Sequence, residues 1–170
     1  GGMTKIMTNR IRSMAGNFIA GATLDDACPV LHSLWKKGTG FSVDLLGEAC
    51  VSTSEAEEYR NRYLELVREL PAIVAPWKDN PSLDHDHLGP IPRVNISIKI
   101  SALYDQLNPL DTEGSIAALT DALAPILEAA GTHDVLVNFD MEQHAFKDLT
   151  LELFRHCCEQ FDFPAGIVLQ

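Results

Sequence analysis

After Gly40 the chain alternates between two kinds of hydrophobic pattern. Short stretches in which apolar and polar residues take turns predict four β-strands, at residues 41–46, 94–103, 135–140 and 166–170. Longer stretches with apolar residues at helical spacing predict the helices between them: one after the capping box Ser52–Glu55, one after Asp111 and one around residues 149–154. This alternation of strand and helix is typical of parallel βαβ units.

Other parts of the chain do not fit this rhythm. The first forty residues predict helices, one of which starts at a capping box, Thr23–Asp26, and ends near Gly38. Pro29 lies inside that stretch, so the helix is expected either to begin later or to kink. Pro71 predicts a break in the helix after Ser52, and Pro125 a bend in the helix after Asp111. Residues 75–92, with four prolines, predict a connecting loop.

The two faces of the strands decide between versions of a parallel α/β fold. In the strand at residues 94–103, Val94, Ile96 and Ile98 share one face, while the other face is polar and carries Lys99. Strands of an open doubly wound sheet are apolar on both faces, whereas barrel strands pack on helices outward and face a lumen inward. A half-exposed antiparallel sheet gives the same alternation, but the intervening helices argue against it.

The sequence therefore favours a (βα)8 barrel of the TIM type. Such a barrel takes about 250 residues, so a chain of 170 residues with about four strands corresponds to its first half. We expect residues 41–170 to form this half barrel and residues 3–40 a helical arm. Residues 1–2 resemble a cloning remnant.

Composition excludes several classes of protein. The net charge of −11 opposes binding to nucleic acid. Because neither an apolar run of membrane-spanning length nor a secretion leader is apparent, we expect a cytoplasmic protein. The four cysteines form no CxxC motif and are expected to be reduced thiols. His85 and His87, between aspartates, fit a solvated connector better than a metal site, so no metal is expected.

Charged and polar side chains gather where the predicted strands end. These are Asp44, Lys99, Asp140 and Gln170, with Glu48 just after the first strand. A lysine flanked by carboxylates can hold a zwitterion such as an amino acid, but it can also be a structural ion-pair layer inside a barrel. Spacing alone leaves both interpretations open.

Five segments of the chain together resemble proline dehydrogenase, most of all the flavin domain of bifunctional proline utilization A proteins. They occur in the family's order: residues 44–49 (DLLGEA), 97–103 (SIKISAL), 138–142 (NFDME), 147–153 (KDLTLEL) and 166–170 (GIVLQ). The resemblance extends from about Ile11 to Gln170.

The resemblance implies a (βα)8 barrel that holds FAD and oxidises L-proline to pyrroline-5-carboxylate, with a quinone at the membrane as electron acceptor. Lys99 would then pair with the substrate carboxylate, and Asp140 would orient Lys99. Glu48 would form an ion-pair gate with an arginine of the last barrel helix, and Gln170 would bind the flavin. Asp44 is matched by motif and is given a supporting role. The enzyme is then expected in the cytoplasm or peripherally at the inner membrane.

Two other functions remain open at this point. A Schiff-base lyase or aldolase barrel would use Lys99 as its nucleophile. A fragment or interaction module would have no activity. Because the later strands of the family barrel have no counterpart here, we expect the isolated chain to be inactive and to self-associate through its open sheet edges.

Overall fold

The computed structural model describes residues 20–21, 23–47, 49–141 and 143–169. The chain divides into two compact units, Gly1–Gly40 and Phe41–Gln170. The described part of the first unit contains helix α2, Leu24–Lys36. As predicted, the Thr23 side chain accepts a hydrogen bond from the Asp26 N–H at its start. Gly38 follows the helix with φ +76°, the left-handed conformation typical of this position. Pro29 lies inside the helix and does not delay its start.

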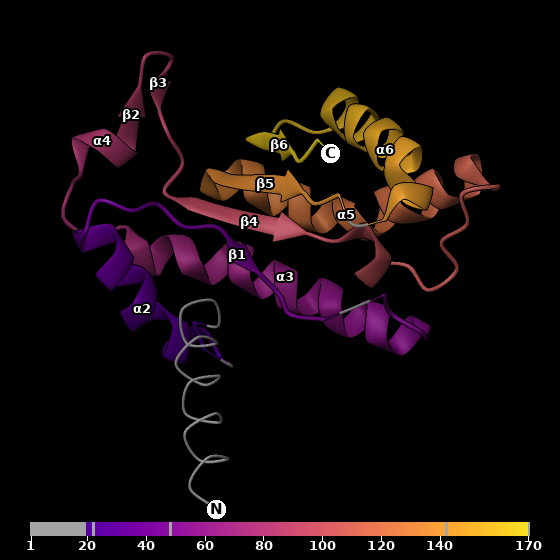
Figure 1. The fold of residues 1–170 in the computed structure, drawn as a ribbon, viewed down its shortest axis with the longest axis horizontal. Coiled ribbons are helices and arrows are strands. Elements are labelled where there is room, and N and C mark those ends of the chain that lie inside the picture. Colours follow the sequence, from indigo (N-terminus) through magenta and orange to yellow (C-terminus); the bar gives the residue numbers. More distant parts are fainter. Residues whose placement is uncertain (1–19, 22, 48, 142, 170) are drawn as a thin grey trace, which may run out of the picture. The chain divides into compact units, whose positions relative to one another are not determined.

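The second unit is a mixed α/β structure built on a parallel sheet (Figure 1). Its four strands lie in the order β1-β4-β5-β6, and neighbouring strands run parallel. This confirms the predicted parallel arrangement. The strands are β1 Val43–Asp44, β4 Val94–Ile98, β5 Val135–Phe139 and β6 Ala165–Ile167.

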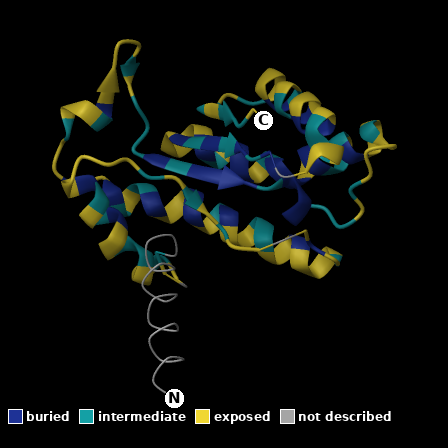
Figure 2. Cartoon of the chain, viewed as in Figure 1, coloured by how far each residue is buried: buried dark blue, intermediate teal, exposed yellow. Residues whose placement is uncertain are grey.

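Three long helices connect the strands of the sheet: α3 Thr53–Val74, α5 Thr112–His133 and α6 Lys147–Gln160. α3 packs against α5 and β4, and α5 packs against β5 and α6. The face of the sheet that these helices cover is the apolar one. Val94, Ile96, Ile98 and the alternate residues of β5 are at most 2% exposed, and Figure 2 shows buried residues concentrated on the strands and the inner sides of the helices.

Two sequence predictions about where an element ends were wrong. Pro71 does not break α3, which continues to Val74, and the Ala75 N–H still bonds the Pro71 carbonyl. The strand predicted over 94–103 ends at Ile98 and is followed by the 3-10 helix η1, Ile100–Ala102. A second 3-10 turn, η2 His144–Phe146, precedes α6.

The segment predicted as a plain loop over 75–92 has secondary structure of its own. It holds the short helix α4, Pro81–Asp84, and a small antiparallel hairpin of β2, His85–Asp86, and β3, Gly89–Pro90. The hairpin stands apart from the main sheet in Figure 1. No helix in the described residues combines the length and apolar character needed to span a membrane.

Candidate functional site

The face of the sheet away from the helices carries polar side chains that bond across neighbouring strands. The Ser42 hydroxyl donates to Asn95 Oδ1 at 3.0 Å. One level further along, the Asn138 amide donates to the Ser97 hydroxyl oxygen at 3.3 Å. These contacts follow from the register, because parallel strands place residues of the same face side by side.

At the carboxyl ends of the strands this polar face ends in a cluster of three charged residues. Lys99 follows β4 directly, Asp44 is the last residue of β1 and Asp140 follows β5. The Lys99 ammonium forms an ion pair with Asp44 and lies 3.7 Å from Asp140 Oδ2. The structure therefore joins three residues that the sequence placed at separate strand ends.

Local backbone contacts fix the carboxylate of Asp140. Its N–H donates to the Ile98 carbonyl at 2.9 Å, which extends the pairing of β4 and β5 by one step. Its Oδ1 accepts from the Met141 N–H at 3.0 Å, so Oδ2 is left facing Lys99. These contacts hold the side chain of Asp140 in place, and it stays accessible to solvent, with 29% of it exposed.

Within the described residues, the contacts of Lys99 leave it capacity to bind an anion. A lysine ammonium has three N–H donors and no acceptor. One donor engages Asp44, and Asp140 lies on a second side. The contacts among the described residues thus involve two of its three donors, and 16% of the Lys99 side chain is exposed. A carboxylate is the natural partner for such a group.

Two of the candidate residues, Glu48 and Gln170, lie outside the described residues. Their roles therefore stay predictions. Asp44 was assigned only a supporting role from the sequence, and the structure gives it the direct contact with Lys99.

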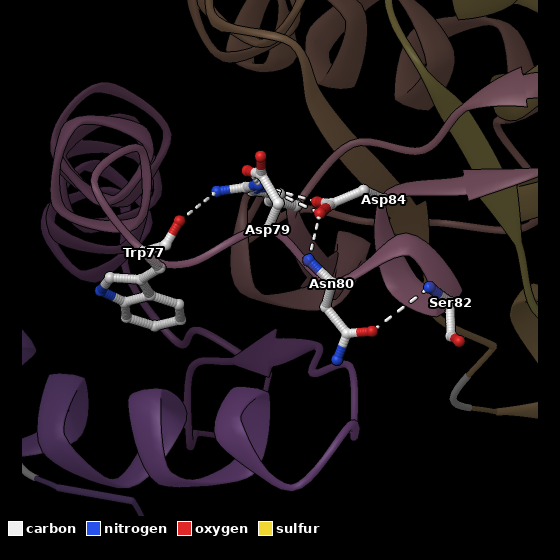
Figure 3. Close-up of polar contacts among 6 residues, drawn as sticks. Trp77, Asp79, Asn80, Ser82 and Asp84 are labelled. Carbon is white, nitrogen blue, oxygen red and sulfur yellow. Dashed lines mark hydrogen bonds and ion pairs between the residues drawn. The ribbon is translucent and has the colours of Figure 1, made fainter.

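A second charged cluster, which the sequence analysis missed, lies just before β4. The Arg93 guanidinium forms two bonds with Asp84, of 2.7 and 3.1 Å, and a third with Asp79 of 2.7 Å. It also donates to the Trp77 carbonyl at 3.0 Å. Figure 3 shows Asp84 turned toward this group, with the Asn80 N–H donating to its carboxylate at 2.7 Å.

The positive charge of Arg93 is paired with aspartates inside this cluster. Burial alone would raise the pKa of the Asp84 carboxyl, but hydrogen bonds from Arg93 and the Asn80 backbone hold it below its ordinary value. The hydrogen bond to Asp84 raises the pKa of Arg93, against the opposing effect of burial. Asp79, Asp84 and Arg93 can be seen in the sequence, but they come together only through the fold of residues 77–93, which local patterns do not predict.

An open groove of about 610 Å³ borders this second cluster, at the amino-terminal end of the sheet. It is lined by Arg93, Asp84, His133 and apolar residues such as Val74 and Ile91. The Lys99 cluster does not line it. We place the candidate site at Lys99, because the Arg93 donors are largely occupied by protein oxygens. Among the described residues, no three His, Cys, Asp or Glu side chains could hold a metal together.

Comparison with known proteins agrees with the parallel α/β fold. Residues 27–170 match the sequence model of the family described as proline dehydrogenase. The chain is 25% identical over 148 residues to the bifunctional protein PutA of Escherichia coli K12, covering 87% of this chain and 10% of PutA. It is 29% identical over 156 residues to proline dehydrogenase 1 of Bacillus subtilis strain 168, covering 92% of this chain and 43% of that protein.

Solved structures with the same fold include two proline utilization A proteins. The protein from Bdellovibrio bacteriovorus, inactivated by N-propargylglycine, superposes with a TM-score of 0.91 and 39% identity, over 100% of this chain and 18% of its own. The protein from Corynebacterium freiburgense gives a TM-score of 0.71 and 29% identity, over 95% and 15%. The chain thus spans less than half the length of these relatives, and it belongs to the proline dehydrogenase family.

Proposed function

We propose that the protein containing this chain oxidises L-proline to pyrroline-5-carboxylate with FAD as its cofactor. The observation that carries this proposal is the Lys99 cation, set between Asp44 and Asp140 at the carboxyl ends of the strands, in a chain of the proline dehydrogenase family. Active sites of parallel α/β folds lie at these strand ends.

The charges of the cluster complement an amino acid that carries both signs. The third donor of Lys99 would bind the carboxylate of proline, and the two aspartates would face its positively charged ring nitrogen. The aspartates also hold Lys99 in one orientation before the substrate arrives, so less side-chain freedom is lost on binding. The site contributes binding and orientation in this scheme.

The donors of the open sheet face suit the polar edge of a flavin ring. The Asn138 amide and the Ser97 hydroxyl are donors on one face of the sheet, and the pyrimidine side of a flavin presents carbonyl and nitrogen acceptors. FAD, when bound, supplies the acceptor for the two electrons that leave proline. We propose Gln170 as a further flavin ligand.

We further propose roles for Glu48 and the electron acceptor on the basis of the family resemblance. Glu48 would act as a gate over the substrate, and a quinone at the membrane would accept the electrons. The enzyme would then work in the cytoplasm or peripherally at the inner membrane.

The structure also bears on the rival use of Lys99 as a nucleophile. A lysine attacks a carbonyl as an uncharged amine, whereas the contact with Asp44 engages Lys99 as a cation. The ion pair therefore favours the role of Lys99 in binding. Borohydride trapping of a carbonyl substrate on Lys99 would instead support the rival function.

We propose that a (βα)8 barrel is completed by residues beyond this chain. β1 and β6 are the outer strands of the four-stranded sheet, and an exposed strand edge is a template for pairing with another chain. The isolated 170-residue chain is therefore expected to be dimeric or larger, without flavin, and inactive with proline. Sedimentation and an absorbance scan test this, and a monomer or a yellow protein that proline bleaches would contradict it.

The direct test of the function uses the complete protein. We expect it to purify with FAD and to lose its flavin absorbance anaerobically when proline is added. Glycine and alanine, which lack the ring of proline, serve as controls. A flavin that proline leaves oxidised, in a folded protein, would contradict the proposed function.

A further inference from the structure

The loop that follows β1 is in close contact with α3 on one side. The Tyr59 hydroxyl lies 3.5 Å from the Leu46 carbonyl oxygen, directly over Gly47. A Cβ atom on residue 47 would come within 1.6 Å of the Tyr59 hydroxyl oxygen. A side chain on residue 47 would therefore displace the Tyr59 hydroxyl. This packing holds the chain two to three residues after Asp44.

Tyr59 is itself fixed by its place on α3. The Arg62 guanidinium lies over its ring, 6.0 Å from the centroid. The helix begins directly after the loop, with the Ser52 side chain accepting from the Glu55 N–H. Glu55 in turn accepts from the Val51 N–H at 2.8 Å. The start of α3 and the end of the loop therefore form one hydrogen-bonded unit.

On its other side the loop is tied to the segment that follows Lys99. Both the N–H and the thiol of Cys50 donate to the Ser101 carbonyl, at 3.0 and 3.3 Å. Cys50 is 7% exposed, and burial, with a smaller contribution from Asp105, raises the pKa of its thiol. The thiol thus stays protonated and remains a donor. A third link joins the same segments, from the Thr53 hydroxyl to Asp105 at 3.2 Å.

These contacts compensate for a very short strand. β1 pairs with β4 at only two positions, the second of which is Asp44 beside Ser97. Among the described residues, the next backbone contact between the two segments is Cys50 to Ser101. Asp44 is the last position of the ladder and Lys99 lies between the ladder and this contact, so the backbone on both sides of Lys99 must be fixed for the ion pair to keep its geometry.

We infer that Tyr59 and Cys50 are positioning residues that set the Lys99–Asp44 ion pair. Tyr59 fixes the end of the Asp44 strand, and Cys50 fixes the backbone after Lys99. Neither is a catalytic residue. The consequence for proline binding rests on the function proposed above, whereas the consequence for the ion pair does not.

The test compares two pairs of variants in the complete protein. Tyr59→Ala removes the ring that packs over Gly47, and Tyr59→Phe keeps this ring and loses only the long hydroxyl contact of 3.5 Å. Cys50→Ala removes the thiol donor, and Cys50→Ser keeps a donor. Cys158→Ala, at an exposed cysteine, is the control for loss of a thiol. Alanine is a strong helix former, so Tyr59→Ala leaves α3 itself intact.

The first readout is independent of activity: the acetylation rate of Lys99 by an amine-reactive ester, measured by mass spectrometry relative to exposed Lys37. The two alanine variants at Tyr59 and Cys50 should raise this rate about 3- to 10-fold, the ratio that corresponds to one ordinary hydrogen bond. The phenylalanine, serine and Cys158 variants should stay near the wild type. The second readout is the Michaelis constant for proline, which should rise in the same order with little change in turnover or flavin content.

The outcomes separate this inference from the proposed function. If the wild type oxidises proline but neither Lys99 acetylation nor the Michaelis constant responds, the inference is wrong and the function stands. If the acetylation pattern appears in a protein that does not oxidise proline, the inference stands and the function is wrong. If Phe and Ser variants behave like the alanine variants, the contacts do not act as described and the inference is wrong. Should Tyr59→Ala fail to fold, Tyr59→Leu replaces it, because leucine keeps apolar packing but does not reach over Gly47.

Discussion

The two ends of the parallel sheet each hold one cation with two aspartates. Arg93 lies before β4 and Lys99 lies after it, and their side chains are similarly shielded, with 20% and 16% exposed. Composition and the exposure of the cation therefore do not distinguish the two clusters. The way in which each cation uses its hydrogen-bond donors does.

The donors of the arginine at the amino-terminal end bond to oxygens of the protein itself. Its guanidinium donates to both oxygens of Asp84, to Asp79 and to the Trp77 carbonyl, all within one segment of the chain. The planar guanidinium suits such a fixed, forked arrangement. The lysine at the other end contacts residues at the ends of two different strands, and its contacts among the described residues involve two of its three donors. One cluster closes a connection between helix and strand, and the other is open to a ligand.

The largest expected effect lies at the open cluster. Lys99→Ala in the complete protein should weaken the binding of proline and its analogues by ~2–5 kcal/mol, the scale for removing one partner of a buried charge pair. Flavin content should hardly change, because Lys99 acts on the substrate. Titration with a proline analogue measures the loss. Normal affinity in this variant would refute the assigned role of Lys99.

The closed cluster should respond through stability instead. Asp84→Asn should lower the free energy of unfolding by about 2 kcal/mol, a value reduced from that of fully buried pairs because Arg93 is partly exposed. The variant should bind proline normally. Denaturant unfolding and analogue titration on the same samples measure both quantities.

The stability effect of Asp84 also has a defined pH dependence. The folded protein holds the pKa of Asp84 below its ordinary value of 3.8. A group whose pKa is lowered on folding stabilises the protein above its unfolded pKa and stops doing so as the pH falls through the folded pKa. The difference between wild type and Asp84→Asn should therefore be constant from pH 7 to about pH 5 and shrink below about pH 4. A difference that stays constant into acid would contradict this account of Asp84.

Glu48→Ala sharpens the comparison at the open end. A gate residue affects closure over the substrate more than the chemistry, because lids exclude water and complete a site. The Michaelis constant for proline should rise several-fold, by roughly 1 kcal/mol in binding, while the protein stays yellow. Loss of FAD from this variant would place Glu48 in the cofactor site.

The smallest effect is expected at an ordinary surface pair. Arg155 lies 3.6 Å from Glu159 on α6, and both side chains are more than 60% exposed. Arg155→Ala should change the unfolding free energy by less than about 0.5 kcal/mol, since exposed pairs contribute little. The same denaturant series gives this value, and a loss as large as that of Asp84→Asn would remove the contrast between buried and exposed pairs.

Much of the fold could be predicted from local pattern. The alternation of Val94, Ile96 and Ile98 with polar residues predicted which face of β4 is buried, and the capping box at Ser52 predicted the start of α3. The side chains of Lys99, Asp44 and Asp140 could be assigned to strand ends, because the period of a strand fixes the face of each residue.

The errors arose where contacts from distant residues override the local signal. Ile100 continues the apolar alternation of β4, yet the backbone there turns into η1, where the Ser101 carbonyl accepts from Cys50. The prolines of residues 75–92 indicated a loop, but the Asp84 carbonyl accepts from the Ile91 N–H and Arg93 holds the Asp84 carboxylate, which together support a hairpin. Such pairings cannot be read from sequence spacing.

The most direct test of the contrast between the two clusters is a crossed experiment on the complete protein. Lys99→Met and Arg93→Met each keep an unbranched apolar stem and remove the charge. Proline-analogue affinity and thermal midpoint are measured for both. We predict that Lys99→Met weakens the binding of the proline analogue with little change in the thermal midpoint. Arg93→Met should lower the thermal midpoint with little change in analogue affinity. The reverse pattern, or both losses in both variants, would contradict the division between an open binding cluster and a closed structural one.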